Sequence, residues 1–156
     1  MNKVEIRLVQ SEDDLDQVRR LYRGFIEWLS QTYFDILPFL QFLFDGLEAD
    51  IAALPGDCAP PSGCIQLAWV DGQAVGTVGF KTCGDGISEM VHMFVSPDAQ
   101  HRGVGRILVE HLIDEARKRG YTHMRLETGP RQIAAQKLYL SLGFETIPPF
   151  HEVEAP

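Results

Sequence analysis

The chain has 156 residues, of which 45% are hydrophobic, and its formal net charge at pH 7 is −8. This length and composition predict a single domain with a sizeable core, over residues 1–156. A chain this acidic is a poor ligand for nucleic acid, so we expect no nucleic-acid partner.

The cysteine, histidine and apolar patterns exclude further classes of protein. The three cysteines are odd in number without Cys-x-x-Cys spacing, and the five histidines lack paired metal-ligand spacing, so we expect neither disulfides nor a metal. Residues 1–5 lack the apolar stretch of a signal peptide, and polar residues interrupt the most apolar segment, residues 34–47. We therefore expect a cytoplasmic protein without a membrane span.

The N-terminal part of the chain predicts one strand, two helices and a loop. Residues 4–8 alternate apolar and charged side chains, as a strand does, and Ser11 begins a capping-box pattern that opens a helix. Residues 35–54 predict a second helix, broken near Pro38, whose phenylalanines we expect in the core or in a subunit contact. The prolines and glycines of residues 54–63 predict a loop.

The rest of the chain alternates strands and helices. Residues 65–70 and 74–80 predict a β-hairpin across Asp71-Gly72, the strongest short-range turn signal in the sequence. Four elements follow in the order strand, helix, strand and helix, over residues 89–95, 104–119, 122–128 and 131–142. This order predicts a mixed α/β sheet.

Residues 95–119 carry the most informative pattern: a strand end, a loop with Gly103 and Gly105, and an amphipathic helix. This arrangement gathers free backbone N–H groups and the positive end of a helix dipole around one small volume, which suits phosphate. The glycines let the backbone approach a diphosphate closely, and Arg102 can add a side-chain charge. No Gly-Lys-Ser/Thr is present, and Leu108 replaces the third glycine of a dinucleotide fingerprint, so neither a nucleoside triphosphate nor a nicotinamide cofactor fits.

Two motifs occur in a defined order. Residues 100–105 are Gln-His-Arg-Gly-Val-Gly, and residues 135–144 hold Ala135, Leu138-Tyr139 and Gly143-Phe144. Over residues 62–147 the chain resembles the GNAT superfamily of acyl-CoA-dependent N-acetyltransferases, with its Q/R-x-x-G-x-G/A and A-x-x-L-Y-x-x-x-G-F signatures, and looks similar to bacterial-type small members. The resemblance implies an α/β (α+β) fold of three layers, in which about four helices flank a central mixed, mostly antiparallel sheet with splayed central strands.

The resemblance also implies that acetyl-CoA is the acetyl donor. Its pantetheine arm would pair with the main chain of the central strand, and its diphosphate would lie on the glycine loop. Gln132 stands where the family usually carries an asparagine that contacts the cofactor. The implied cofactor-binding residues are Met93, Phe94, Val95, Gln100, His101, Arg102, Gly103, Val104, Gly105, Arg106, Gln132 and Tyr139.

Acetyl transfer to an amine requires a base for the ammonium and an acid for the leaving thiolate. By the resemblance, Tyr139 matches the general acid and Glu89 matches a glutamate that serves as the base. Glu127, His92 and ordered water are the competing bases.

We expect transfer to a primary amine of a small molecule, by direct attack in a ternary complex. A peptide or protein amine is the alternative acceptor. The rival class is a non-catalytic acyl-CoA sensor with an interface built from Trp28, Tyr33, Phe34 and Phe39, and a third interpretation is a nucleotide binder outside the family. Only residues 150–153 can supply the last strand that the family adds beside the acceptor pocket, so a second subunit of a homodimer is a possible completion.

Overall fold

The computed structural model of this chain describes residues 3–129 and 132–150, apart from the side chain of residue 39. Three predicted features therefore lie outside the described part: residues 151–153 of the possible last strand, Arg131 of the last helix, and the side chain of Phe39.

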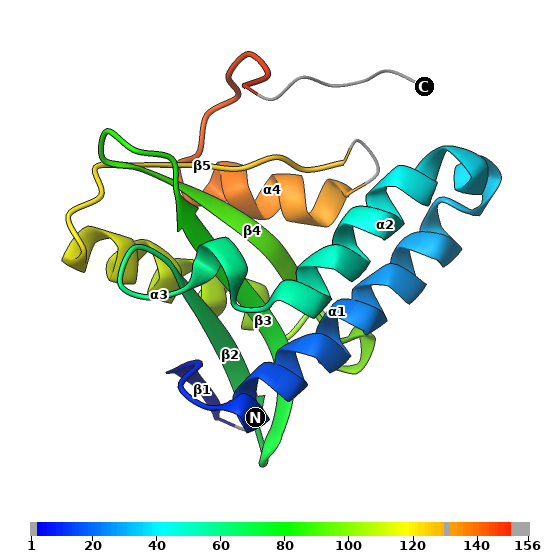
Figure 1. Cartoon of the computed structure of the whole chain (residues 1–156), viewed down its shortest axis with the longest axis horizontal. Helices are drawn as coiled ribbons and strands as arrows, with labels where there is room; N and C mark the ends of the chain where they lie inside the picture. The colour runs from blue at the N-terminus through cyan, green and yellow to red at the C-terminus, as the bar shows by residue number, and fades with distance from the viewer. Residues whose placement is uncertain (1–2, 130–131, 151–156) are drawn as a thin grey trace.

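A five-stranded sheet forms the centre of the fold, with its strands in sequence order (Figure 1). The first four strands pair antiparallel, and the fifth pairs parallel to the fourth. The strands are β1 (Val4–Leu8), β2 (Cys64–Val70), β3 (Gln73–Thr82), β4 (Ile87–Val95) and β5 (His123–Arg125). The mixed, mostly antiparallel sheet predicted from the sequence is confirmed.

Helices cover both faces of the sheet, which gives three layers (Figure 1). On one face α1 (Glu12–Thr32) packs on the strands and α2 (Leu37–Ala53) lies beside α1. On the other face α3 (Val104–Lys118) and α4 (Ile133–Ser141) share a second core with the sheet. Short 3-10 turns lie at Phe34–Ile36, Gly56–Cys58 and Pro97–Ala99.

Local sequence signals set several element boundaries. The hydroxyl of Ser11 accepts a hydrogen bond from the amide of Asp14 at 3.1 Å, which caps α1 as the sequence predicts. Asp71 and Gly72 have φ values of 50° and 78°, the left-handed pair that a two-residue hairpin needs. Pro38 does not break a helix: it lies in the first turn of α2, where a missing amide hydrogen costs nothing.

The phenylalanines of the α1–α2 hairpin have mixed environments. Phe34 and Phe42 are 70% and 82% exposed, so neither belongs to the core, whereas Phe44 is partly buried beside Leu47. A subunit contact through the exposed pair stays a prediction.

β4 and β5 separate after only three pairs, and the last pair is Glu89 with Arg125. β4 continues to Val95, whereas the strand predicted over 122–128 pairs only over His123–Arg125. We call the opening between β4 and residues 126–128 the fork. It is the splay of the central strands that the family resemblance implies.

A β-bulge lies in β4 beside the fork. One residue of β3 lies between Thr77 and Gly79, whereas two residues of β4 lie between their partners Phe94 and Val91, so β4 carries one extra residue. His92 lies in this interval with φ 55°, a left-handed conformation that few non-glycine residues adopt. The bulge therefore bends β4 where it leaves β5.

Candidate active site

The loop after β4 brings backbone amides together at the start of α3. Gly103 is the N-cap residue of α3 with φ 79°, and His101 also has a positive φ of 64°. The amides of Val104, Gly105 and Arg106 belong to the first helical turn, where an α-helix offers them no acceptor of its own. A Cβ atom at Gly103 would meet nothing within 4 Å, so open space adjoins this turn.

Side chains of the loop hold it against its neighbours. The amide group of Gln100 donates to the carbonyl of Val95 at 3.0 Å. Arg106 donates to the hydroxyl of Ser141 at 2.6 Å and pairs with Glu110 at 3.4 Å, which ties α3 to α4. Gln100 and Arg106 therefore position the loop with their side chains, while Arg102 is exposed.

Gly105 lies where α3, α4 and β4 converge. A Cβ atom on Gly105 would lie 3.5 Å from Leu138 Cδ2, 3.7 Å from Met93 Sδ and 3.9 Å from Val95 Cγ2. The structure thus brings the last helix, which comes much later in the sequence, beside the glycine loop and the end of the central strand. Phe94 points to the opposite face and packs with the core under α1.

Tyr139 is buried on α4, with 8% of its surface exposed. Its ring meets Phe144 edge to face, with centroids 5.8 Å apart. Burial raises the pKa of the Tyr139 phenol to about 12, because the charged phenolate is poorly solvated there. The hydroxyl therefore keeps its hydrogen at neutral pH, as a general acid requires.

Gln132 stabilises the turn before α4. Its side-chain oxygen accepts from the hydroxyl of Thr128 at 2.7 Å and from the amide of Gly129 at 3.2 Å. Glu127, one of the competing bases, is exposed just before this turn. Gln132 thus shapes the segment that borders the fork.

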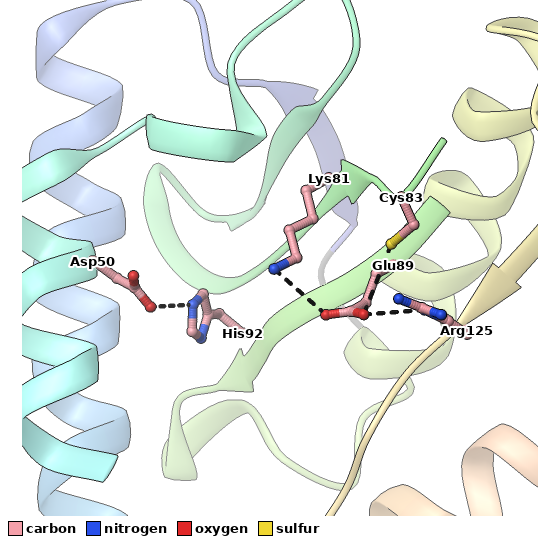
Figure 2. A network of polar contacts seen from close by, with 6 residues as sticks. All are labelled: Asp50, Lys81, Cys83, Glu89, His92 and Arg125. Atoms are coloured by element: carbon pink, nitrogen blue, oxygen red, sulfur yellow. Dashed lines mark hydrogen bonds and ion pairs between the residues drawn. The ribbon is translucent and has the colours of Figure 1, made fainter. Parts of the chain in front are cut away.

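Glu89 lies on the α1 and α2 side of the sheet as the centre of an ion-pair network (Figure 2). It is only 6% exposed, and its carboxylate pairs with Arg125 at 3.2 Å and with Lys81 at 3.7 Å. The thiol of Cys83 donates to the same carboxylate at 3.8 Å. The network joins β3, β4 and β5 at the closed end of the fork.

His92 and Asp50 form a second polar contact on the same side (Figure 2). His92 Nε2 lies 2.9 Å from Asp50 Oδ2 on α2, and the imidazole packs on the ring of Tyr22 on α1, with centroids 4.8 Å apart. Burial lowers the pKa of His92, and Asp50 offsets part of that shift. His92 is therefore neutral at physiological pH.

A cavity of about 530 Å³ opens beside the ion-pair network. Strands β3 to β5 form one wall, and the segment after α2 forms the other. The residues that line it include Asp57, Ser62, Lys81, Cys83, Glu89 and Arg125. Both a carboxylate and cationic groups thus face a space large enough for a small molecule.

Sequence reasoning missed Lys81, Arg125 and Asp50 as members of this region. Lys81 directly follows the strand predicted over residues 74–80, and Arg125 lies within the strand predicted over residues 122–128; a charge that a strand carries into a fold is costly unless it is paired. That signal was available for these two residues. Asp50 lies on an exposed helical position, where nothing in the sequence separates it from a solvated acid.

Within residues 3–129 and 132–150, no helix has the length and apolarity to cross a bilayer. The same part of the chain holds no cluster of three or more metal-ligating side chains.

Comparisons with known proteins agree with this geometry. The model of the acetyltransferase (GNAT) family matches residues 15–144. An uncharacterized N-acetyltransferase of Schizosaccharomyces pombe is 28% identical over 157 residues, which cover 99% of this chain and 91% of the relative. The ribosomal protein bS18-alanine N-acetyltransferase of Escherichia coli is 49% identical over 55 residues, only 35% of this chain and 37% of that protein. Relatives therefore occur in a eukaryote as well as in bacteria.

Solved structures share the fold at lower identity. A GNAT-family acetyltransferase from Staphylococcus aureus Mu50 superposes with a TM-score of 0.76 at 18% identity, covering 98% of this chain and 95% of the other. The PaiA N-acetyltransferase of Thermoplasma acidophilum, solved with coenzyme A, gives 0.75 at 17% identity, covering 92% and 90%. Because the family model spans most of the sequence and the fold is the same, this chain belongs to the GNAT acetyltransferase family.

Proposed function

We propose that this protein is an N-acetyltransferase that moves an acetyl group from acetyl-CoA to a primary amine of a small molecule, by direct attack in a ternary complex. One observation carries the proposal: the first turn of α3, the end of β4 and the last helix converge around Gly105. The first-turn amides of α3, the fork edge of β4 and the helix that carries Tyr139 thereby meet at one place.

The residues present fit coenzyme A. The first-turn amides of α3 and the left-handed Gly103 form a cradle for a diphosphate, and Arg102 is free to approach from solvent. Beyond its last pair with β5, the fork edge of β4 at residues 93–95 is available for main-chain pairing with an extended arm. His101, Val104 and Arg106 contribute main-chain groups, and Gln132 shapes the far border of the fork.

Acetyl-CoA supplies an activated acyl group as its thioester. Tyr139 then donates its hydroxyl hydrogen to the departing sulfur, because burial keeps the phenol protonated. Main-chain amides near Val95 would stabilise negative charge on the acyl oxygen. Glu89 is the proposed base for the proton of the acceptor ammonium, and His92, Glu127 and ordered water are the alternatives.

The cavity beside Glu89 is the proposed acceptor site. Its volume of about 530 Å³ lies within the range of small-molecule pockets, roughly 300–1,000 Å³. Because the relative from Escherichia coli is named for acetylating an alanine of a ribosomal protein, a peptide amine is the alternative acceptor.

A thiol-release assay tests this function. Purified protein and acetyl-CoA are mixed with polyamines, amino acids, aminoglycoside-like amines and a peptide that begins with alanine. We expect free thiol with at least one small amine, and release slower by about 100-fold or more with the Tyr139→Phe variant at the same enzyme concentration. Tight coenzyme A binding in calorimetry without thiol release from any amine would identify a sensor instead.

A further inference from the structure

We propose that the acceptor is a zwitterionic amino acid, a primary amine that also carries a carboxylate, and that Arg125 and Lys81 bind this carboxylate. The inference rests on the acetyl transfer proposed above and names the substrate class of the same cavity. It sets aside polyamines, aminoglycoside-like amines and peptide N-termini.

The charges around the cavity are balanced among the described residues that line it. Asp57 and Glu89 are acidic, so they can pair with an ammonium. Lys81 and Arg125 are cationic and would repel the additional ammonium groups of a polyamine or an aminoglycoside. A zwitterion carries one charge of each sign, so each of its charges meets an opposite charge in the cavity. The chain as a whole has a net charge of −8, so this balance is a local property of the cavity.

Arg125 presents a shaped cationic edge to the cavity. Its Nε atom donates to Glu89 Oε1 at 3.2 Å, so this contact engages one side of the guanidinium. The ring of Phe150 covers one face of the same group, with 4.1 Å between Cζ and the ring centroid. The edge formed by the two terminal nitrogens lies outside both contacts. Two parallel N–H groups on such an edge match the two oxygens of a carboxylate.

Lys81 provides a second cation on the other side of Glu89. Its Nζ atom lies 3.7 Å from Oε2 of Glu89, and Figure 2 shows Lys81 and Arg125 approaching this carboxylate from opposite sides. A separation of 3.7 Å is longer than a hydrogen bond, so the ammonium of Lys81 is able to turn toward a second anion. One carbon atom joins the ammonium and the carboxylate of an α-amino acid. Both groups therefore reach this row of alternating charges, the ammonium beside Glu89 and the carboxylate beside Arg125 or Lys81.

The position of Glu89 places the bound amine at the fork. Glu89 and Arg125 are the last pair between β4 and β5, so the cavity meets the fork at these residues. An ammonium held by Glu89 thus lies beside its proposed base, at the boundary with the proposed coenzyme A site.

The opposite wall of the cavity is held in place by hydrogen bonds. Arg119 donates to the carbonyl of Pro61 at 3.1 Å, and the hydroxyl of Tyr121 donates to the carbonyl of Ser62. These bonds tie the loop before β2 to the segment after α3. The cavity is therefore formed before a ligand enters, as is usual for small-molecule sites.

Comparison of an amino acid with its own carboxamide isolates the carboxylate. Thiol release from acetyl-CoA is measured with the standard α-amino acids, spermidine and a peptide that begins with alanine. We expect kcat/KM for the best amino acid to exceed that for its carboxamide by roughly tenfold or more, the value of one charge-assisted hydrogen bond. The carboxamide has the more acidic ammonium, so the intrinsic reactivity of the amine favours the opposite result.

Arg125→Gln and Lys81→Gln remove the cations one at a time. Arg125→Gln should lower the ratio of kcat/KM for the amino acid to that for the carboxamide by roughly 10- to 100-fold. Arg125→Lys should restore only part of this ratio, because an ammonium lacks the planar edge. The ratio is the informative quantity, since a disturbed Glu89 or a damaged fold lowers both rates alike. Arg117→Gln is the matched control: this arginine is 74% exposed on α3, and its loss should leave the ratio unchanged.

Alkylation of Cys83 gives a readout that needs no turnover. Cys83 lines the cavity and is half-buried, whereas burial raises the pKa of the Cys58 and Cys64 thiols to about 12. Iodoacetamide should therefore label Cys83 first. With coenzyme A present, the amino acid should slow this labelling in mass spectrometry. Its carboxamide should not, and the amino acid should not protect Cys83 in Arg125→Gln.

The outcomes separate the acceptor assignment from the acetyl transfer. A higher kcat/KM for spermidine or the peptide than for every amino acid overturns the acceptor assignment while the transfer stands. A ratio that is unchanged in both Arg125→Gln and Lys81→Gln overturns the role of these cations. Protection of Cys83 by an amino acid without thiol release from any amine supports carboxylate binding and refutes the transfer. Neither protection nor thiol release overturns both.

Discussion

Replacement of Gly103 by valine separates ligand binding from folding. Gly103 has φ 79° and ψ 6° at the start of α3, and a Cβ atom there meets no atom within 4 Å. No clash adds to the backbone penalty, so the loss of stability is about 1–2 kcal/mol, the cost of a left-handed L-residue. For a chain of this size that lowers Tm by roughly 2–8 °C.

We expect Gly103→Val to weaken coenzyme A binding more clearly than it lowers the stability of the fold. A valine relaxes the loop toward negative φ and turns the first amides of α3 away from a diphosphate. Each charge-assisted hydrogen bond is worth about 1.5–3 kcal/mol. Loss of a single one raises the Kd for coenzyme A by roughly tenfold or more.

Gly120 supplies a matched control for calorimetry. It also has a positive φ, 89°, and open space at its Cβ position, but it follows the opposite end of α3. Gly120→Val should lower Tm by a similar amount and leave the Kd for coenzyme A unchanged. Equal affinities for wild type, Gly103→Val and Gly120→Val would refute the proposed diphosphate site.

Three further predictions concern α3, α4 and the buried thiols. Gly105→Ala should raise the free energy of unfolding by about 0.5–1 kcal/mol in thermal unfolding, because alanine favours the helix and its new methyl group lies 3.5 Å or more from its neighbours. The same variant should bind coenzyme A more weakly in calorimetry, and a less stable fold or an unchanged affinity would contradict this. Tyr139→Phe should lower kcat by about 100-fold or more in steady-state kinetics with little change in KM for acetyl-CoA, and wild-type turnover would leave Tyr139 a packing residue. Burial raises the pKa of the Cys58 and Cys64 thiols to about 12 from 9.0, so the contribution of the protonated thiols to folding stability is complete below pH 9 and is lost as the pH rises toward 12. The Tm should fall over that pH range, and it should fall less steeply in Cys58→Ala. An identical slope in the variant would exclude that thiol as a source.

Features set by neighbouring residues could be predicted from the sequence. The hairpin at Asp71-Gly72 and the cap at Ser11 each depend on a few adjacent side chains, and both occur as expected. The position of Pro38 shows the limit of such signals, because proline both breaks a helix and starts one. In the structure Pro38 lies in the first turn of α2, a helix that packs beside α1 through contacts that are not local.

The candidate site also contains features that the sequence predicts and features that depend on contacts between distant residues. The glycine loop and Tyr139 belong to contiguous motifs, so the sequence indicates them directly. The contact of His92 with Asp50 joins residues 42 positions apart, and the pair of Glu89 with Arg125 spans 36. The periodicity of apolar residues does not predict which acid on α2 contacts which residue of β4. These contacts can therefore be identified only from the folded structure.

The extra residue in β4 accounts for both sides of the site at once. Before the bulge Val91 faces α1, and after it Phe94 faces the same helix, while Met93 and Val95 turn toward Gly105 and α4. In a regular strand, alternation would direct residues 93 and 95 to the face of Val91. The contacts at Gly105 therefore depend on the same irregularity that puts His92 on the α1 and α2 side of the sheet. One inserted residue thus sets side chains on both faces of β4: Met93 and Val95 beside the proposed coenzyme A site, and His92 beside Asp50 and Tyr22.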